Sequence, residues 1–221
     1  MYVEDPSTPL LVAATTGTLS PFLAALLAKQ RAEEPQTPVR IVETSIEDQH
    51  QGLKDGRYCL GLSLVAEKRH APLQSISLWQ DELAVAIPLR SPLLRYSEIP
   101  LQMVVDYPLI TWRKGTCHPI EKKISALLES ASHNLKVVER VNSLELMEIL
   151  VASGYGVGIY TKTHITAMRS LGIVMRPLAG RPNLVSTYLV LPQASPPSAV
   201  DRIIQRANTI QTIVDCAFRS H

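Results

Sequence analysis

The hydrophobic pattern of the first 64 residues alternates between strand-like and helix-like segments. The apolar run from Leu10 to Ala14 has the length of a strand buried on both faces, and Leu23, Leu26 and Leu27 follow at helical spacing. The same order then repeats, with a strand at Val39 to Val42, a helix at Ile46 to Lys54 and a strand at Tyr58 to Leu64. This β-α-β-α-β order predicts a parallel sheet covered by helices.

Helix boundaries in this part are marked by proline, glycine and acidic residues. Pro21 is suited to a first helical turn, and the sequence Glu33-Glu34-Pro35 predicts the end of that helix. Asp55-Gly56 predicts the end of the second helix.

The middle of the chain predicts a passage between two lobes. Residues 65 to 75 are typical of an irregular loop, and two separate strand-like pieces follow at Ile76 to Leu78 and Leu83 to Ile87. Three prolines then punctuate the chain, at Pro88, Pro92 and Pro100, and we expect the crossing just before them.

A second set of α/β elements follows. The predicted elements are a strand at Leu109 to Trp112, a polar loop at Arg113 to His118, a helix from Pro119 through Leu128, a strand at Val137 and Val138, a helix capped by Ser143 and closed by Gly154, a buried strand in GYGVGIY, a helix over 161–170 and an extended segment at Ile173 to Pro177.

The end of the chain predicts a strand and a long amphipathic helix. The strand covers Leu184 to Leu191, and the helix runs from about Ser198 to Arg219, with an apolar stripe made of Ile203, Ile204, Ala207, Ile210, Ile213, Val214 and Ala217. We expect this helix to pack on the first lobe. The fold class is therefore α/β, with one subdomain of residues 1–84 and 184–221, a second of 85–183, and a ligand cleft between them.

Composition narrows the class of protein. The 221 residues include 22 Lys and Arg and 20 Asp and Glu, so the chain lacks the strong overall positive charge that is typical of DNA-binding proteins. Three widely spaced cysteines favour reduced thiols. Without a basic and apolar leader or an apolar run of bilayer length, we expect a cytoplasmic chain with no membrane contact.

The candidate binding residues lie in hydroxyl-bearing turns that precede helices. They are Thr16, Gly17, Thr18, Thr44, Ser45, Asn142 and Ser143, to which Arg113 and Thr116 are added from the polar loop. Strand ends and helix N-termini present N–H and O–H donors, so their convergence in a cleft would bind a small anion or carboxylate. The alternative is that each hydroxyl caps its own helix and that Arg113 is a solvated loop cation.

Candidates for catalysis are weak. The six histidines are scattered, and Cys117-His118 is the one pair that would merit a test for nucleophilic or redox chemistry. We expect no catalytic residue, no metal site and no cofactor, and hence no enzyme.

Five segments together resemble the effector-binding domain of LysR-type transcriptional regulators. They are LLVAATTGTLSPFLAALLAKQRAEEP, GLKDGRYCLGLS, LAVAIPLRSPL, YPLITWRKGT and VNSLELMEILVASGYGVGIY. The chain departs from the family pattern at Cys59, Ser91, Tyr160 and Thr161, which bears more on effector identity than on fold.

The resemblance implies a two-lobed fold like that of type 2 periplasmic binding proteins, with a small-molecule effector in the cleft. It also implies a homodimer or homotetramer and effector contacts from the turns that carry Thr16, Thr18, Thr44, Ser45, Asn142 and Ser143. Family members bind DNA through an N-terminal winged helix-turn-helix, which this sequence does not show, so we expect a fragment of a longer regulator. An exported solute-binding protein of the same fold is the alternative.

Overall fold

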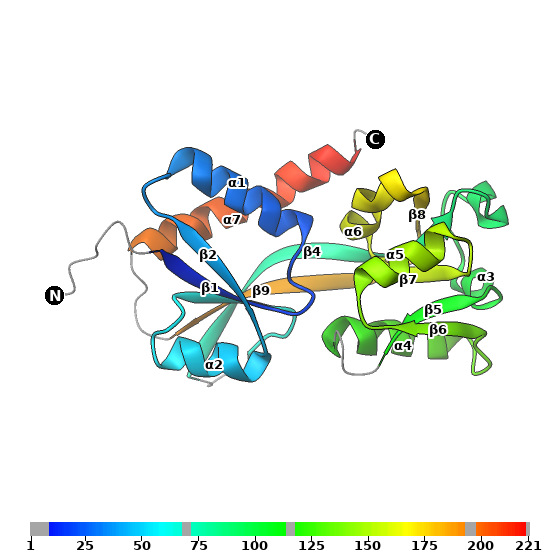
Figure 1. Ribbon diagram of the computed structural model, residues 1–221, viewed down its shortest axis with the longest axis horizontal. Coiled ribbons are helices and arrows are strands. Elements are labelled where there is room, and N and C mark those ends of the chain that lie inside the picture. Colours follow the sequence, from blue (N-terminus) through cyan, green and yellow to red (C-terminus); the bar gives the residue numbers. More distant parts are fainter. Residues whose placement is uncertain (1–8, 68–71, 114–117, 193–197, 220–221) are drawn as a thin grey trace. The chain divides into compact units, whose positions relative to one another are not determined.

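The structure is a computed structural model that describes residues 9–67, 72–113, 118–192 and 198–219 (Figure 1). Its packing divides the chain into two compact units. Unit 1 comprises Met1–Gln80 with Ser186–His221, and unit 2 comprises Asp81–Val185. The chain therefore passes from one unit to the other twice.

Unit 1 is built on a parallel sheet. Strand β1 (Leu10–Thr15) lies between β2 (Val39–Thr44) and β3 (Leu60–Ser63) and is parallel to both, while β9 (Leu184–Pro192) pairs antiparallel with β3. Its helices are α1 (Pro21–Glu33), α2 (Ile46–Lys54) and α7 (Ser198–Arg219). The predicted β-α-β-α-β order is confirmed.

Helix α7 packs on unit 1 as predicted. Its residues Ile203, Ala207 and Ile210 belong to one hydrophobic core with Phe22 and Trp79. The Trp79 indole Nε1–H donates to the carbonyl of Ala207 at 3.0 Å, and the ring stacks on Phe22 at 5.7 Å between centroids. The predicted apolar stripe was wrong at Ile213, which is 46% exposed, because the buried face of α7 follows Ile203, Ala207, Ile210 and Val214 and Ile213 lies to one side of it.

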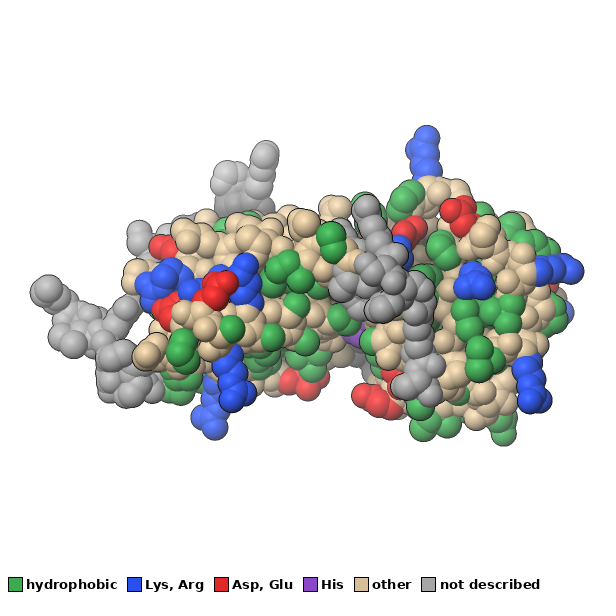
Figure 2. Space-filling view, turned by 90° about the horizontal axis from the view of Figure 1, so that it is seen from above, with side chains coloured by type: hydrophobic (Ala, Val, Ile, Leu, Met, Phe, Trp, Pro, Cys, Tyr) green, Lys and Arg blue, Asp and Glu red, His purple; other side chains and the backbone are tan. Residues whose placement is uncertain are grey.

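Ion pairs add to the contact between α1 and α7. Arg206 lies 2.9 Å from Glu33 and 2.7 Å from Glu34, and Arg202 also bonds Glu34. The hydrogen bond from Arg202 is the main reason why the pKa of Glu34 is lowered to about 2. Figure 2 shows these basic and acidic side chains gathered on the face formed by the two helices.

Unit 2 has a mixed sheet. Strand β5 (Leu109–Trp112) is parallel to β6 (Val137–Val141) and β7 (Val157–Thr161), whereas β4 (Leu73–Pro88) is antiparallel to β7 and to β8 (Ile173–Pro177). The helical elements are η1 (Pro92–Arg95), α3 (Leu101–Val105), α4 (His118–Ala131), α5 (Leu144–Ala152), α6 (Lys162–Ala167) and η2 (Met168–Leu171).

The predicted pair of short strands at 76–78 and 83–87 is wrong, because β4 is one continuous strand. The polar residues between the two pieces do not end it, since the Asp81 carboxylate accepts hydrogen bonds from the backbone N–H and the hydroxyl of Thr163. The short elements η1 and α3 were not predicted.

Helix α5 begins and ends where predicted. The Ser143 hydroxyl accepts from the backbone N–H of Leu146 at 3.3 Å, and Gly154, at φ +79°, follows the last turn. The N–H groups of Gly154 and Tyr155 donate to the carbonyls of Val151 and Leu150, which is the Schellman arrangement. Glycine is suited to this position because a left-handed φ costs it little.

Within the described ranges, no helix is both long and apolar enough to cross a membrane.

Candidate functional site

The turn between β1 and α1 carries three of the predicted residues. Gly17 has φ +89°, Thr16 is exposed, and Thr18 is fully buried. The Thr18 hydroxyl donates to the Thr15 carbonyl at 2.7 Å, and the Thr15 hydroxyl donates to the Leu62 carbonyl at 3.1 Å. Thr15 and Thr18 therefore hold the turn to the sheet, whereas Thr16 presents its hydroxyl outward.

Helix α1 has no side-chain cap. Ser20 stands at the N-cap with extended backbone angles, but its hydroxyl does not bond the first helical turn. The Ser20 Oγ atom is shielded from solvent and has no hydrogen-bond partner among the residues that the structure describes. The positive end of a 13-residue helix thus lacks the usual internal acceptor, which favours an external anion.

The hydrogen-bonding groups of the turn between β2 and α2 find their partners within the chain. The Ser45 hydroxyl accepts from the backbone N–H of Asp48 at 3.1 Å, as an N-cap does. The Asp48 carboxylate then accepts from the hydroxyls of Thr44 at 2.6 Å and Tyr58 at 2.8 Å, and from Arg57 at 3.0 Å. These hydrogen bonds, led by that from Thr44, lower the pKa of Asp48 to about 2.

Asp48 therefore supplies a negative charge inside the first turn of α2, which disfavours a second anion there. The sequence did carry a signal for this role: a serine followed three residues later by an acidic residue resembles a capping box.

Both turns of unit 1 lie at the same edge of its sheet. The register pairs Thr15 with Thr44, so the parallel strands β1 and β2 end side by side. The structure thus brings the predicted residues Thr16, Gly17, Thr18, Thr44 and Ser45 to one edge, and it assigns the latter two to the Asp48 network.

The predicted residues of unit 2 also share a sheet edge. Strands β5 and β6 end together at Trp112 and Val141, and the Arg113 backbone N–H donates to the Val141 carbonyl at 2.8 Å. Arg113 and Asn142 are exposed, and Ser143 caps α5. Thr116, Cys117 and the polar-loop interpretation of 114–117 lie outside the described residues.

Sequence reasoning missed an aromatic cluster at this edge. The Trp112 ring lies 5.2 Å from that of Tyr160, which lies 5.0 Å from His164. The Thr161 hydroxyl and His164 Nδ1 are 2.6 Å apart. Within the described part of the chain, the buried indole Nε1–H of Trp112 has no hydrogen-bond partner. No short sequence motif predicts such a cluster, because its members come from two strands and a helix.

In the described parts of the chain, no group of three or more His, Cys, Asp or Glu side chains is arranged to hold a metal ion.

Comparison with curated proteins gives one relative. The chain is 27% identical over 149 residues to a probable cat1 operon transcriptional activator from Acinetobacter lwoffii. The match covers 67% of this chain and 49% of the relative, so the chain spans about half the length of that protein.

Comparison with solved structures shows the fold. The effector-binding domain of BenM with its effector benzoate matches with a TM-score of 0.76 at 15% identity, covering 93% of this chain and 92% of that one. The effector-binding domain of QuiR in complex with shikimate matches with a TM-score of 0.72 at 16% identity, covering 93% and 98%. These are two-lobed folds of the type 2 periplasmic-binding-protein class, so the predicted fold class is confirmed.

The family comparison covers nearly the whole chain. The LysR substrate-binding domain family matches residues 4–209. The chain belongs to the LysR substrate-binding domain family.

Proposed function

We propose that this chain is the effector-sensing part of a LysR-type transcriptional regulator and that it binds a small carboxylate or other small anion. One observation carries the choice of ligand: α1 begins without a side-chain cap, beside the exposed Thr16 and the unpartnered Ser20 hydroxyl. Free N–H groups, a positive dipole end and hydroxyl donors favour a negative group.

The comparisons support the same ligand class. The BenM and QuiR domains are described with benzoate and shikimate, and both ligands are carboxylates at neutral pH. We propose that Thr16 and Gly17 contact the ligand, that the Ser20 hydroxyl, shielded in the ligand-free chain, reaches it by rotating about its Cα–Cβ bond, and that the buried Thr18 positions the turn. Arg113, Thr116, Asn142 and Ser143 are proposed contacts from the other subdomain.

The proposed mechanism is a shift between two arrangements of the protein. Each of the proposed subdomains, residues 1–84 with 184–221 and residues 85–183, supplies some of the proposed contacts to the effector. A ligand that contacts the two arrangements differently shifts their populations, typically by ~1–3 kcal/mol. In a longer homo-oligomeric regulator in the cytoplasm, this shift would alter DNA binding and transcription. We propose binding without turnover.

Calorimetric titration with benzoate, shikimate and sulfate tests this function. We expect at least one probe to bind the wild-type chain and Ser20→Ala to weaken it by about tenfold, the value of one charge-assisted hydrogen bond. Ser45→Ala is the matched control, since Ser45 also stands at an N-cap but is already engaged. Equal affinity in the wild-type and in both Thr16→Ala and Ser20→Ala variants would refute the proposed site.

A further inference from the structure

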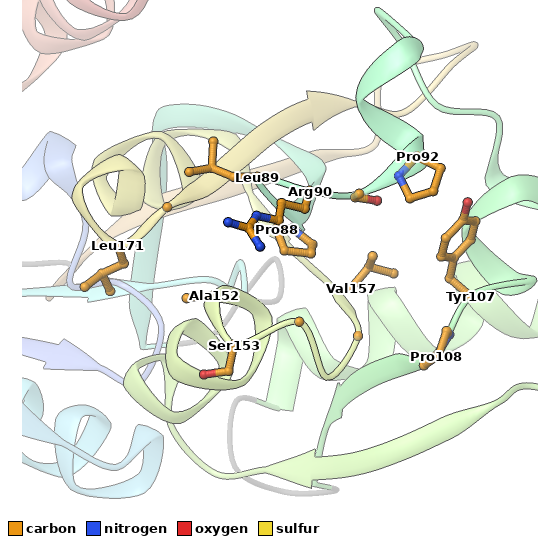
Figure 3. A pocket seen from close by; sticks show the side chains of 14 residues that line it. Pro88, Leu89, Arg90, Pro92, Tyr107, Pro108, Ala152, Ser153, Val157 and Leu171 are labelled. Atoms are coloured by element: carbon orange, nitrogen blue, oxygen red, sulfur yellow. The ribbon is translucent and has the colours of Figure 1, made fainter.

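A cavity lies within unit 2, away from the sheet edge described above. Its volume is about 600 Å³, and its walls include Pro88, Pro92, Pro108, Val157 and Leu171, with Arg90 beside them. We call it the proline pocket (Figure 3). A volume of this size lies in the range of small-molecule binding sites.

The proline pocket and the proposed effector contacts lie at opposite ends of the same elements. Pro108 precedes β5, whereas Arg113 follows it. Helix α5 begins after Ser143 and ends at Ala152, which lines the pocket. At about 1.5 Å per residue, the nine residues of α5 separate its two ends by roughly 13 Å. The pocket is therefore a separate site.

The walls of the proline pocket are largely apolar and are conformationally restricted. Three prolines have fixed φ angles, so little backbone freedom is lost when a ligand binds. The close approach of Gly156 to Pro108 also fixes the wall, because a Cβ atom on Gly156 would lie 2.5 Å from the Pro108 carbonyl oxygen. The N–H of Val157 donates to this same carbonyl at 2.9 Å. An apolar ligand body suits such a preformed cavity.

Arg90 gives the proline pocket its charge. In Figure 3 its side chain extends from the segment after β4 toward the side where Ala152 lies. Within the described residues, the guanidinium of Arg90 forms neither a hydrogen bond nor an ion pair. The hydroxyl of Tyr107, which also lines the pocket, is likewise without a partner there. No acidic side chain lines the cavity to neutralise Arg90.

We propose that the proline pocket binds a second small molecule, an aromatic or alicyclic carboxylate. Arg90 would pair with the carboxylate through its planar fork of N–H donors, and the ring would lie against the prolines and Val157. Tyr107 would add one hydroxyl donor. The proposal does not depend on the effector site at α1.

The test uses 3-phenylpropionate as the probe and ¹H–¹⁵N correlation spectra of the labelled chain as the readout. We expect concentration-dependent shifts of the amides of 89–91 and 153–157. Arg90→Gln should weaken the probe by roughly 10-fold or more, because it removes a charge-assisted hydrogen bond while keeping a polar side chain. The neutral 3-phenylpropionamide should bind correspondingly less tightly.

Two control variants separate this site from others. Arg95→Gln removes an exposed arginine of the same unit that does not line the pocket, and it should leave the affinity unchanged. Ser20→Ala alters the proposed effector site and should also leave the shifts at 89–91 unchanged. Ala152→Phe, at a helical position on the pocket wall, should abolish binding by filling the cavity.

Three results would overturn the proposal. The first is that the probe shifts none of the amides of 89–91 and 153–157. The second is that Arg90→Gln, with an otherwise native spectrum, binds the probe as tightly as the wild-type chain. The third is that these amides shift with protein concentration alone. The last result would show that a second copy of the chain covers the pocket.

Discussion

Unit 1 contains two strand–turn–helix segments that look alike in sequence but differ in their chemistry. Each places a serine at the N-cap of a helix that follows a strand of the parallel β1–β2 pair. Ser45 caps α2, and the Asp48 carboxylate occupies its first turn. Ser20 leaves α1 uncapped, and no acidic residue lies in the first turn. The comparison teaches that a helix N-terminus becomes a candidate anion site when the chain does not satisfy it from within.

The two segments share one support, and its loss should have the largest effect. The buried Gln49 of α2 donates from Nε2 to the carbonyls of Ala13 at 2.8 Å and Leu62 at 2.9 Å, which ties α2 of the second segment to β1 of the first segment and to β3. We expect Gln49→Ala to lower the free energy of unfolding by about 2–4 kcal/mol, because it leaves a cavity and removes both hydrogen bonds, although the Leu62 carbonyl keeps the one from the Thr15 hydroxyl.

Urea unfolding measures this loss, and Gln51→Ala is the control because Gln51 is an exposed neighbour on the same helix. For Gln51→Ala we expect a change in the free energy of unfolding below about 0.5 kcal/mol, which is typical of such a surface position. If both variants were equally stable, Gln49 would not be the common support of the two turns.

The two N-cap serines should differ in what they do for stability. Ser45→Ala should cost about 1 kcal/mol, the usual cost of losing a cap. Ser20→Ala should change the free energy of unfolding by less than about 0.5 kcal/mol, because its hydroxyl bonds nothing in the ligand-free chain. Thermal unfolding without added anions compares them, and equal losses would contradict the assignment of Ser20 to a ligand.

The smallest expected effect is the acid dependence of the α2 turn. The pKa of Asp48 falls from 3.8 to about 2 on folding, so the folded state binds this proton less readily than the unfolded state. The carboxylate therefore stabilises the fold above about pH 4. That contribution is lost as the pH falls toward 2. It is modest, because the Arg57–Asp48 pair is partly exposed.

Unfolding of the wild-type chain and Asp48→Asn between pH 6 and pH 2 tests this dependence. The stability difference between the two should shrink as the pH falls, while the titration of Glu34 affects both and cancels. A difference that stayed constant with pH would show that Asp48 acts through packing and not through its charge.

The sequence by itself determined most of the elements. Residues 46–54, 109–112 and 173–177 form the predicted helix and strands, and Ser143 and Gly154 begin and close α5 as expected. These features depend on apolar spacing and on caps, which act over a few residues and are therefore visible in the sequence. The family resemblance was visible for a similar reason, since it depends on the order of several local segments.

Only the tertiary structure decided which polar groups are engaged and which are available. Strand β4 continues through Asp81 because the Asp81 carboxylate accepts a hydrogen bond from Thr163. Thr163 lies 82 residues away in the chain, so the sequence does not show that the two residues meet. The Thr44 hydroxyl, a predicted ligand contact, bonds Asp48, while Ser20 is left without a partner. Arg90, which is unpaired within the described residues, is a candidate ligand contact because it lines the same cavity as three prolines. A hydrogen bond is fixed by distance and direction in space, and the spacing of residues along a chain does not contain that information.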